Sequence, residues 1–274
     1  MSINVISTST RKRVPTSAGT VREIITADDA EAKHVRASIH EVEPNKTLEF
    51  NSGDKTHLVY VIDGSGAQFS FKGEKYPANK GTGLYLEAGD KASVTAGGNK
   101  LSVLQLNVPQ HKAKSVSGVK NSYYFDEEKL QSLVDSGKIR IRSFWVNKET
   151  GLSNSWDMQA GLMYYLPHAY APRHKHDATT TNPDGAVHFY MIFEGTATVD
   201  DDAGKTLPLG PGDLVLIPHS EWHQLKATET GLRYMEFQGP FDFTTSMIDD
   251  PLGKDWYIKG TDDGTGNLIK WVQS

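Results

Sequence analysis

Three histidines stand close together between positions 174 and 188, and a fourth follows at position 223. His174 and His176 are one residue apart, so on an extended strand both side chains point to the same face. His188 begins the next apolar run, and His223 comes after a further strand and a turn. Neutral imidazole is a good ligand for Fe, Mn, Ni, Cu, Co and Zn. Four imidazoles from three segments therefore predict a site for one transition metal ion.

Each histidine also has a simpler interpretation. A lone histidine on a strand is usually a surface residue or a hydrogen-bonded core residue. His168 and His219 flank the cluster and are candidates for a catalytic base or for a residue that orients a ligand, although a rim position in water is the more common place for such a histidine. For the cluster itself, the alternative to metal binding is a degenerate site whose histidines only hydrogen-bond one another.

Short strands must position these side chains. The run 57–71 is an apolar strand, a Gly-rich turn and an alternating strand, and 188–218 repeats that layout. Many short strands at about ten-residue spacing are typical of an all-β sandwich or barrel. The repeat aligns His57 with His188, which indicates two copies of one unit.

A short helix is expected between the two copies, over 125–140. Asp126 can cap it, Leu133 contributes to an apolar face and Gly137 can end it. The tail after Pro240 is rich in Gly and Asp and contains isolated aromatic residues. The expected organisation is an N-terminal barrel without a metal site over 1–120, a helical linker over 121–154, a metal-binding barrel over 155–240 and an arm packing on the barrels over 241–274.

The histidine pattern resembles the two motifs of the cupin superfamily. The first motif is His-x-His, a carboxylate a few residues later, then six residues and a Gly. His174 and His176 match the His-x-His, and His188 stands at the carboxylate position, six residues before Gly195. The second motif is matched by Gly212, Pro218 and His223. The resemblance covers both halves and implies a two-domain bicupin in which each domain is a double-stranded β-helix, or jelly-roll, barrel.

Several departures from the motifs have consequences for function. The usual carboxylate ligand is replaced by His188, so the resemblance implies a site with four histidines. Eleven residues, 177–187, follow the His-x-His where three or four are usual, which predicts a long loop at the barrel mouth. The N-terminal copy keeps His57 but has Ala92 where the second-motif histidine belongs. That copy is therefore expected to be structural.

A four-histidine site leaves the 2+ charge of the metal uncompensated, and it favours an anionic chelating substrate such as an enolate, a 2-oxo acid or a dicarbonyl. The first hypothesis is an oxidoreductase similar to all-His cupin dioxygenases, which would use Fe(II) and O2. The second is a Lewis-acid hydrolase or isomerase with a layout similar to (S)-ureidoglycine aminohydrolase. The third is a small-molecule-binding cupin without catalysis. Fe(II) is favoured, and Mn(II), Ni(II) and Zn(II) remain open.

Three aromatic residues are candidates for substrate contact. Tyr190 shares its strand face with His188 and is also a candidate catalytic residue, Tyr165 lies on a neighbouring strand, and Trp222 precedes His223. A place in the barrel core is the alternative for the tyrosines.

Composition limits the partners. The chain has 274 residues, a formal net charge of -5 and no cysteine. A weakly acidic chain is a poor candidate for binding nucleic acid or an anionic membrane, and disulfides and thiolate ligands are excluded. No run approaches eighteen apolar residues, and the N-terminus lacks the apolar core of a secretory signal. We expect a cytoplasmic protein and, from the resemblance, a homodimer.

Overall fold

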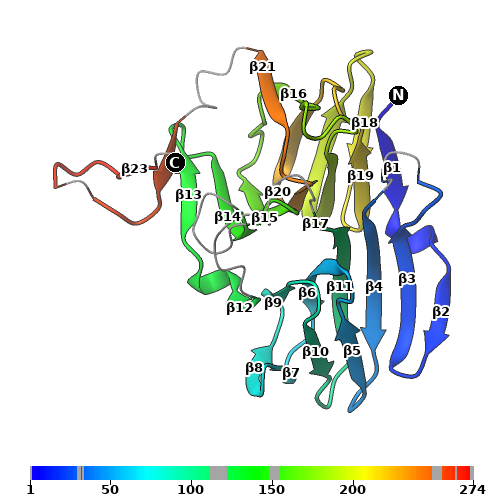
Figure 1. Ribbon diagram of the computed structural model, residues 1–274. Coiled ribbons are helices and arrows are strands. Elements are labelled where there is room, and N and C mark those ends of the chain that lie inside the picture. The colour runs from blue at the N-terminus through cyan, green and yellow to red at the C-terminus, as the bar shows by residue number, and fades with distance from the viewer. Residues whose placement is uncertain are drawn as a thin grey trace. The chain divides into compact units, whose positions relative to one another are not determined.

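The computed structural model is built almost entirely of β-strands (Figure 1). It describes residues 2–29, 32, 34–110, 122–147, 155–248, 255–262 and 264–271. The chain divides into two compact units: an N-terminal unit, Thr8–Lys129, and a C-terminal unit made of Met1–Ser7 and Leu130–Ser274. The all-β prediction is confirmed. Among the described residues, no helix is long and apolar enough to cross a membrane.

The N-terminal unit has two antiparallel sheets in the described residues. One has the strand order β12-β9-β6-β11-β4-β3-β2 and the other β5-β10-β7-β8. The strands are β2 (Arg13–Thr16), β3 (Gly19–Ile25), β4 (Arg36–Val42), β5 (Thr47–Asn51), β6 (Lys55–Asp63), β7 (Ala67–Phe71), β8 (Glu74–Ala78), β9 (Thr82–Leu86), β10 (Lys91–Thr95), β11 (Leu101–Pro109) and β12 (Tyr123–Asp126).

The C-terminal unit has a large sheet with the order β1-β19-β17-β20-β15-β14-β13-β22-β23, in which β18 also pairs with β17. A separate pair is formed by β16 and β21. The strands are β1 (Asn4–Ser7), β13 (Ser132–Asp135), β14 (Arg140–Val146), β15 (Gln159–Tyr165), β16 (Arg173–Asp177), β17 (Val187–Asp200), β18 (Thr206–Leu209), β19 (Asp213–Ile217), β20 (Gln224–Gly239), β21 (Thr244–Ile248), β22 (Trp256–Ile258) and β23 (Lys270–Trp271).

Each unit has its own apolar core, which follows from alternation along the strands. In the C-terminal unit, Tyr190 and Ile192 of β17 pack with Val215 and Ile217 of β19 in one buried cluster. Successive side chains of a strand point to opposite faces, so residues of one parity enter one core. The N-terminal unit builds a second cluster in the same way around Val59.

Gly195, which follows the apolar half of β17, shows why a glycine is needed there. Its φ of +80° lies in the left-handed region, and a Cβ at this position would lie 2.2 Å from the carbonyl oxygen of Gly231. The pairing of β17 with β20 shifts register at the same place. Only glycine allows this close approach, so the spacing from His188 to Gly195 reflects a backbone constraint on the strand that carries the histidine.

The helix predicted over 125–140 is wrong. The segment contains the end of β12, one 3-10 turn at Glu127–Lys129 and then β13. Leu133 and Val134 are buried because they pair with β14 on one side and β22 on the other. Lys138, with φ of +57°, lies in the turn that leads into β14. Tertiary pairing thus outweighs the helical pattern, and the remaining linker residues 148–154 lie outside the described residues.

The turn between β13 and β14 encloses a buried ion pair. Asp135 Oδ2 lies 2.6 Å from Arg140 Nε, and the two side chains are 0% and 3% exposed. Asp135 Oδ1 also accepts a hydrogen bond from the backbone N–H of Ile139 at 2.9 Å. The pair therefore holds the start of β14, which carries residues of the site described below.

Removing Asp135 is expected to destabilise the C-terminal unit strongly. Asp135→Ala would leave the Arg140 guanidinium buried without its counter-charge, at a cost of about 3–5 kcal/mol in the free energy of unfolding. Urea unfolding measures this. The control is Asp126→Ala, which removes the solvent-screened ion pair with Lys129 and should have a much smaller effect. Equal effects of the two variants would contradict the role given to the buried pair.

Candidate metal centre

Three of the predicted histidines meet in the C-terminal unit. His174 and His176 come from β16, and His223 immediately precedes β20. Backbone hydrogen bonds in both directions join His174 to His223, with N···O distances of 3.0 and 2.9 Å. The ligand atoms of the three side chains all lie within 4.8 Å of one another, and no other such group of His, Asp and Glu occurs among the described residues.

Two of these imidazoles are oriented by backbone carbonyls. His174 Nδ1 lies 2.7 Å from the carbonyl oxygen of Pro172, and His223 Nδ1 lies 2.9 Å from that of Glu221. A carbonyl oxygen only accepts, so Nδ1 carries the proton in both rings and Nε2 keeps its lone pair. The Nε2 atom of His223 is buried and has no hydrogen-bond partner. This is the tautomer that a metal ligand needs.

His176 is held by side chains instead. Its Nδ1 lies 3.0 Å from the hydroxyl of Thr245 on β21. Its Nε2 accepts a hydrogen bond from Gln238 Nε2 at 2.9 Å. Gln238 in turn accepts from Gln159 at 2.7 Å. Because Nε2 accepts, Nδ1 of His176 carries the proton and donates to Thr245. Nε2 is therefore the ligand nitrogen of His176, and a metal would bind there in exchange for the hydrogen bond from the Gln238 amide.

His188 belongs to the same cluster. Its ring centroid lies 4.7 Å from that of His176 and 5.1 Å from that of His223. The residue is 1% exposed, and neither ring nitrogen makes a hydrogen bond. The nearest charged atom is Glu236 Oε1, 3.5 Å from His188 Nε2. A buried imidazole that makes no hydrogen bond is costly, which is a reason for it to have a ligand in the functional protein.

Burial keeps His174, His176 and His223 neutral. Desolvation lowers the pKa of His174 to about 4, against the opposing effect of the Pro172 carbonyl. Desolvation, with the neighbouring histidines, lowers the pKa of His176 and His223 well below the ordinary value. Neutral imidazoles offer lone pairs at pH 7, so the site is in the state that binds a cation.

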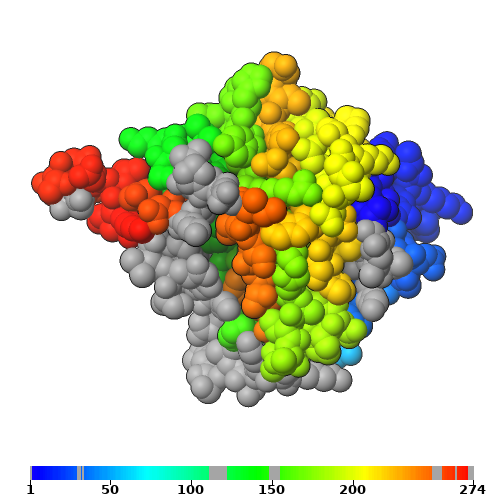
Figure 2. Space-filling view, turned by 90° about the horizontal axis from the view of Figure 1, so that it is seen from above, coloured from blue at the N-terminus to red at the C-terminus, as the bar shows by residue number. Residues whose placement is uncertain are grey.

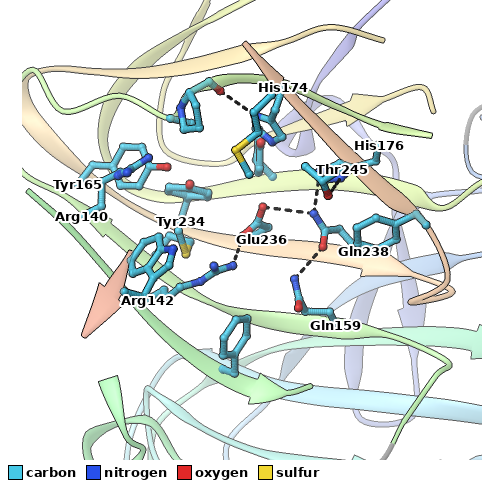
Figure 3. A pocket seen from close by; sticks show the side chains of 18 of the residues that line it. Arg140, Arg142, Gln159, Tyr165, His174, His176, Tyr234, Glu236, Gln238 and Thr245 are labelled. Carbon is cyan, nitrogen blue, oxygen red and sulfur yellow. Dashed lines mark hydrogen bonds and ion pairs between the residues drawn. The ribbon is translucent and has the colours of Figure 1, made fainter. Parts of the chain in front are cut away.

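A cavity of about 490 Å³ opens beside the histidines (Figure 3). His174 and His176 line it directly, whereas His188 and His223 are fully buried next to them. The other polar lining residues are Arg140, Arg142, Gln159, Tyr165, Tyr190, Tyr234, Glu236, Gln238 and Thr245. The apolar lining residues are Phe144, Met163, Ala171, Pro172, Phe241, Phe243, Met247 and Trp256.

One wall of the cavity comes from the segment that follows β20. Phe243 packs its ring against His176 with a centroid distance of 4.7 Å. β21 pairs with β16 in a register that sets Thr245 opposite His176. Figure 2 shows β21, in orange, at the surface of the molecule. The predicted arm thus contributes to the site, a role that its composition did not indicate.

The long loop at 177–187 is tied to the same segment. Thr181 donates to a carboxylate oxygen of Asp242 at 2.6 Å, and Asn182 Nδ2 donates to the backbone carbonyl of Asp242 at 3.1 Å. The loop and the residues before β21 are therefore held together beside the cavity.

Sequence reasoning missed Glu236 and Arg142. Glu236 of β20 lies between His188, 3.5 Å away, and Arg142 of β14, whose Nη2 is 3.6 Å from Glu236 Oε2. Burial alone would raise the pKa of Glu236, but His188 and Arg142 lower it below the ordinary value. A signal for Glu236 was present in the run "LRYMEFQG": an acidic residue stands inside an apolar strand, between Met235 and Phe237, which are both buried.

The other predicted residues divide into two groups. Tyr165 and Tyr190 line the cavity, and burial raises the pKa of both hydroxyls. His168 is exposed in a turn with φ of +63°, and His219 is half-buried; neither lines the cavity. Trp222 does not line it either, and the Lys175 ammonium lies over its ring at 5.5 Å. These three were expected near the substrate because they neighbour the histidines in sequence, but alternation and turns direct them elsewhere.

In the N-terminal unit, His57 is a buried residue, 5% exposed, with Nδ1 3.3 Å from Gln105 Nε2. Burial, helped by Lys55, lowers its pKa to about 4. An unfolded chain would protonate this ring near pH 6.5, so His57 favours unfolding as the pH falls from about 6.5 to 4.

We expect His57→Gln to flatten this pH dependence. The wild-type unit should lose up to roughly 2–3 kcal/mol of unfolding free energy between pH 7 and pH 4 through His57, and the variant should not. Urea titrations at both pH values measure the difference. A variant with the same acid sensitivity as the wild type would show that other groups cause it.

The comparisons with known proteins agree with this architecture. Residues 161–235 match the model of the Cupin domain family. A mutant of oxalate decarboxylase from Bacillus subtilis has 14% sequence identity and a TM-score of 0.69, over 89% of this chain and 79% of that chain. The formate complex of the Lactobacillus farciminis enzyme has 15% identity and a TM-score of 0.67, over 89% and 88%. The protein Ylba from E. coli has 13% identity and a TM-score of 0.68, over 86% and 90%. No curated protein matches the sequence.

At these identities the solved structures show the fold alone. The chain has the bicupin layout expected from the motifs, and the Cupin match falls on the unit that holds the histidine cluster.

Proposed function

We propose that this bicupin is a metalloenzyme that binds one divalent transition metal on His174, His176, His188 and His223 and oxidises a small anionic chelating substrate with O2. The substrate would occupy the cavity beside the histidines. The observation that carries the proposal is the set of buried imidazole nitrogens. The Nε2 atom of His223 and both nitrogens of His188 make no hydrogen bond, and the Nδ1–H of His174 and of His223 is held by a carbonyl.

These residues fit a metal by their chemistry. Nitrogen donors without any thiolate suit Fe(II), Mn(II), Ni(II) and Zn(II), and neutral imidazoles do not discriminate sharply among them. A bound divalent metal would act as a Lewis acid and as a template for a chelating anion. Fe(II) is the proposed metal for the oxidative reaction. A solved B. subtilis oxalate decarboxylase is described with Mn(II) centres, which supports Mn(II) as the alternative.

The residues of the chain would perform the binding and the proton transfer. Glu236 is the carboxylate within the cavity and is ionised, so it can accept a proton from a substrate that becomes an enolate. Tyr190 and Tyr234 keep their protons because burial raises their pKa well above the ordinary value, so they can only donate or accept hydrogen bonds. The apolar wall that contains Phe241 and Phe243 would exclude water from the reacting groups.

A redox-neutral reaction is the second candidate, and the position of Glu236 favours it. A carboxylate that moves a proton beside a Lewis acid is sufficient for hydrolysis or isomerisation without O2. The third interpretation, a cupin that binds a small acid without turnover, requires Glu236 to serve only as the counter-charge of Arg142.

Metal analysis and oxygen uptake test the proposal together. Protein purified without chelators would be analysed for metal, then reconstituted with Fe(II) without oxygen and mixed with 2-oxo acids, β-diketones and catecholic enols at an oxygen electrode. About one metal ion per chain with substrate-dependent oxygen uptake supports the oxidoreductase. Metal with product formation but no oxygen uptake supports the redox-neutral enzyme. A chain that takes up no metal overturns the proposal.

A further inference from the structure

Arg142 has the properties of an anion-recognition residue. Its guanidinium carbon lies 4.5 Å from the ring centroid of Phe144 and 4.8 Å from that of Trp256, so two aromatic rings hold it in place. Its Nε is buried and has no hydrogen-bond partner. Its ion pair with Glu236, at 3.6 Å, is too long for a hydrogen bond. A guanidinium that lines the cavity, is held between two rings and makes no short ion pair is suited to a carboxylate.

The other arginine of the cavity does not have this freedom. Arg140 is bound by Asp135 at 2.6 Å, and both side chains are almost completely buried. Figure 3 shows Arg142, in contrast, directed toward Glu236 within the cavity. Of the two guanidiniums, only Arg142 can therefore turn N–H donors to a ligand without breaking a short buried ion pair.

The charges of the cavity indicate the charge of the ligand. Asp135 cancels Arg140, and Glu236 cancels Arg142. Histidine ligands bring no negative charge to a metal, so a bound divalent metal would leave its two positive charges uncompensated. A substrate with two negative charges would neutralise the occupied site, whereas a monoanion would leave it with a net charge in a partly desolvated cavity.

The two ends of such a substrate have separate receptors. Glu236 contacts His188 with one oxygen and Arg142 with the other, so the histidine cluster and Arg142 lie on opposite sides of one carboxylate. A ligand that spans them needs a chelating group, a short chain and a second acidic group. The rings of Phe144 and Trp256 beside Arg142 suit the methylene groups of that chain.

We propose that Arg142 determines specificity by binding a second carboxylate, and that the substrate is a small 2-oxo dicarboxylate whose 2-oxo acid end reaches the histidines. The inference rests on the proposed function, because it assumes the metal as the receptor of the chelating end. It adds the substrate class and the residue that selects it.

Matched pairs of ligands test the inference. Each pair has the same 2-oxo acid end and chain length, and one member replaces the distal carboxylate with a methyl group: oxaloacetate and 2-oxobutanoate, 2-oxoglutarate and 2-oxopentanoate, 2-oxoadipate and 2-oxohexanoate. Binding is measured by calorimetry to Ni(II)-loaded protein. For at least one pair we expect the wild type to prefer the dicarboxylate, and Arg142→Met to weaken that dicarboxylate about 30-fold while changing the monocarboxylate less than about 3-fold.

The controls separate the possible failures. Lys226→Met removes an exposed charge on β20, outside the cavity lining, and should leave both affinities unchanged. Arg142→Lys keeps the charge and guards against a folding defect; it should lie between the wild type and Arg142→Met. Equal affinities within every pair, or an equal loss for both members, overturn the role of Arg142 alone. A chain that binds no metal overturns the proposed function and this inference together.

Discussion

Replacing His223 with alanine is expected to abolish metal binding. The residue is completely buried, its Nδ1–H is held by the Glu221 carbonyl, and its Nε2 has no partner in the protein. Loss of a direct ligand should weaken metal affinity by roughly 100-fold or more, because loss of a group that only hydrogen-bonds a ligand already costs 10- to 100-fold. Metal per chain after dialysis, with a competition titration for affinity, measures the effect.

His219→Ala is the matched control. The two histidines are four residues apart in the same turn region, but His219 is half-buried and lies outside the cluster. His219→Ala should keep the full metal content, and His57→Ala should keep it as well. His188→Ala separates a four-histidine site from a three-histidine site, since loss of metal is expected only if His188 is a ligand. Stoichiometric metal in His223→Ala would contradict the site.

The histidine cluster could be predicted because it depends on local spacing. Alternation puts His174 and His176 on one face of a strand, and the motif spacings place His188 and His223 on neighbouring elements. The partners of the cluster could not be predicted in the same way. Thr245 and Glu236 come from strands far along the chain, and they reach the site through the pairing of β21 with β16 and of β20 with β17.

In the fold, too, features that follow from local sequence could be predicted, and features that depend on distant strand pairing could not. Strands with strong alternation and turn signals were predictable, and so was the repeat. The segment 125–140 was not, because Leu133 and Val134 satisfy a helical pattern and a strand pattern equally well. Burial between β14 and β22 selects the strand. Trp222, which neighbours a histidine in sequence, does not line the cavity. Thr245 and Glu236, which are brought near the histidines by strand pairing, do line it.

Replacing Glu236 with glutamine is expected to remove proton transfer and retain the metal. Glutamine has nearly the same shape but cannot accept the proton as a carboxylate does. For the 2-oxo acid that binds best, exchange of the C3 protons with deuterium from solvent should slow by about 100-fold or more. NMR follows this exchange without oxygen, so the result does not depend on whether the overall reaction is oxidative.

Glu194→Gln is the control for this variant, because Glu194 lies on β17 outside the cavity lining. Both variants should keep the wild-type metal content. Glu236→Gln should also bind anionic ligands more tightly, since Arg142 would no longer share its charge with a protein carboxylate. Tighter ligand binding together with slower exchange is the result expected of a proton acceptor. If Glu236 only maintained the shape of the cavity, its replacement would weaken ligand binding instead. Unchanged exchange would leave Glu236 as the counter-charge of Arg142 and would favour the non-catalytic interpretation.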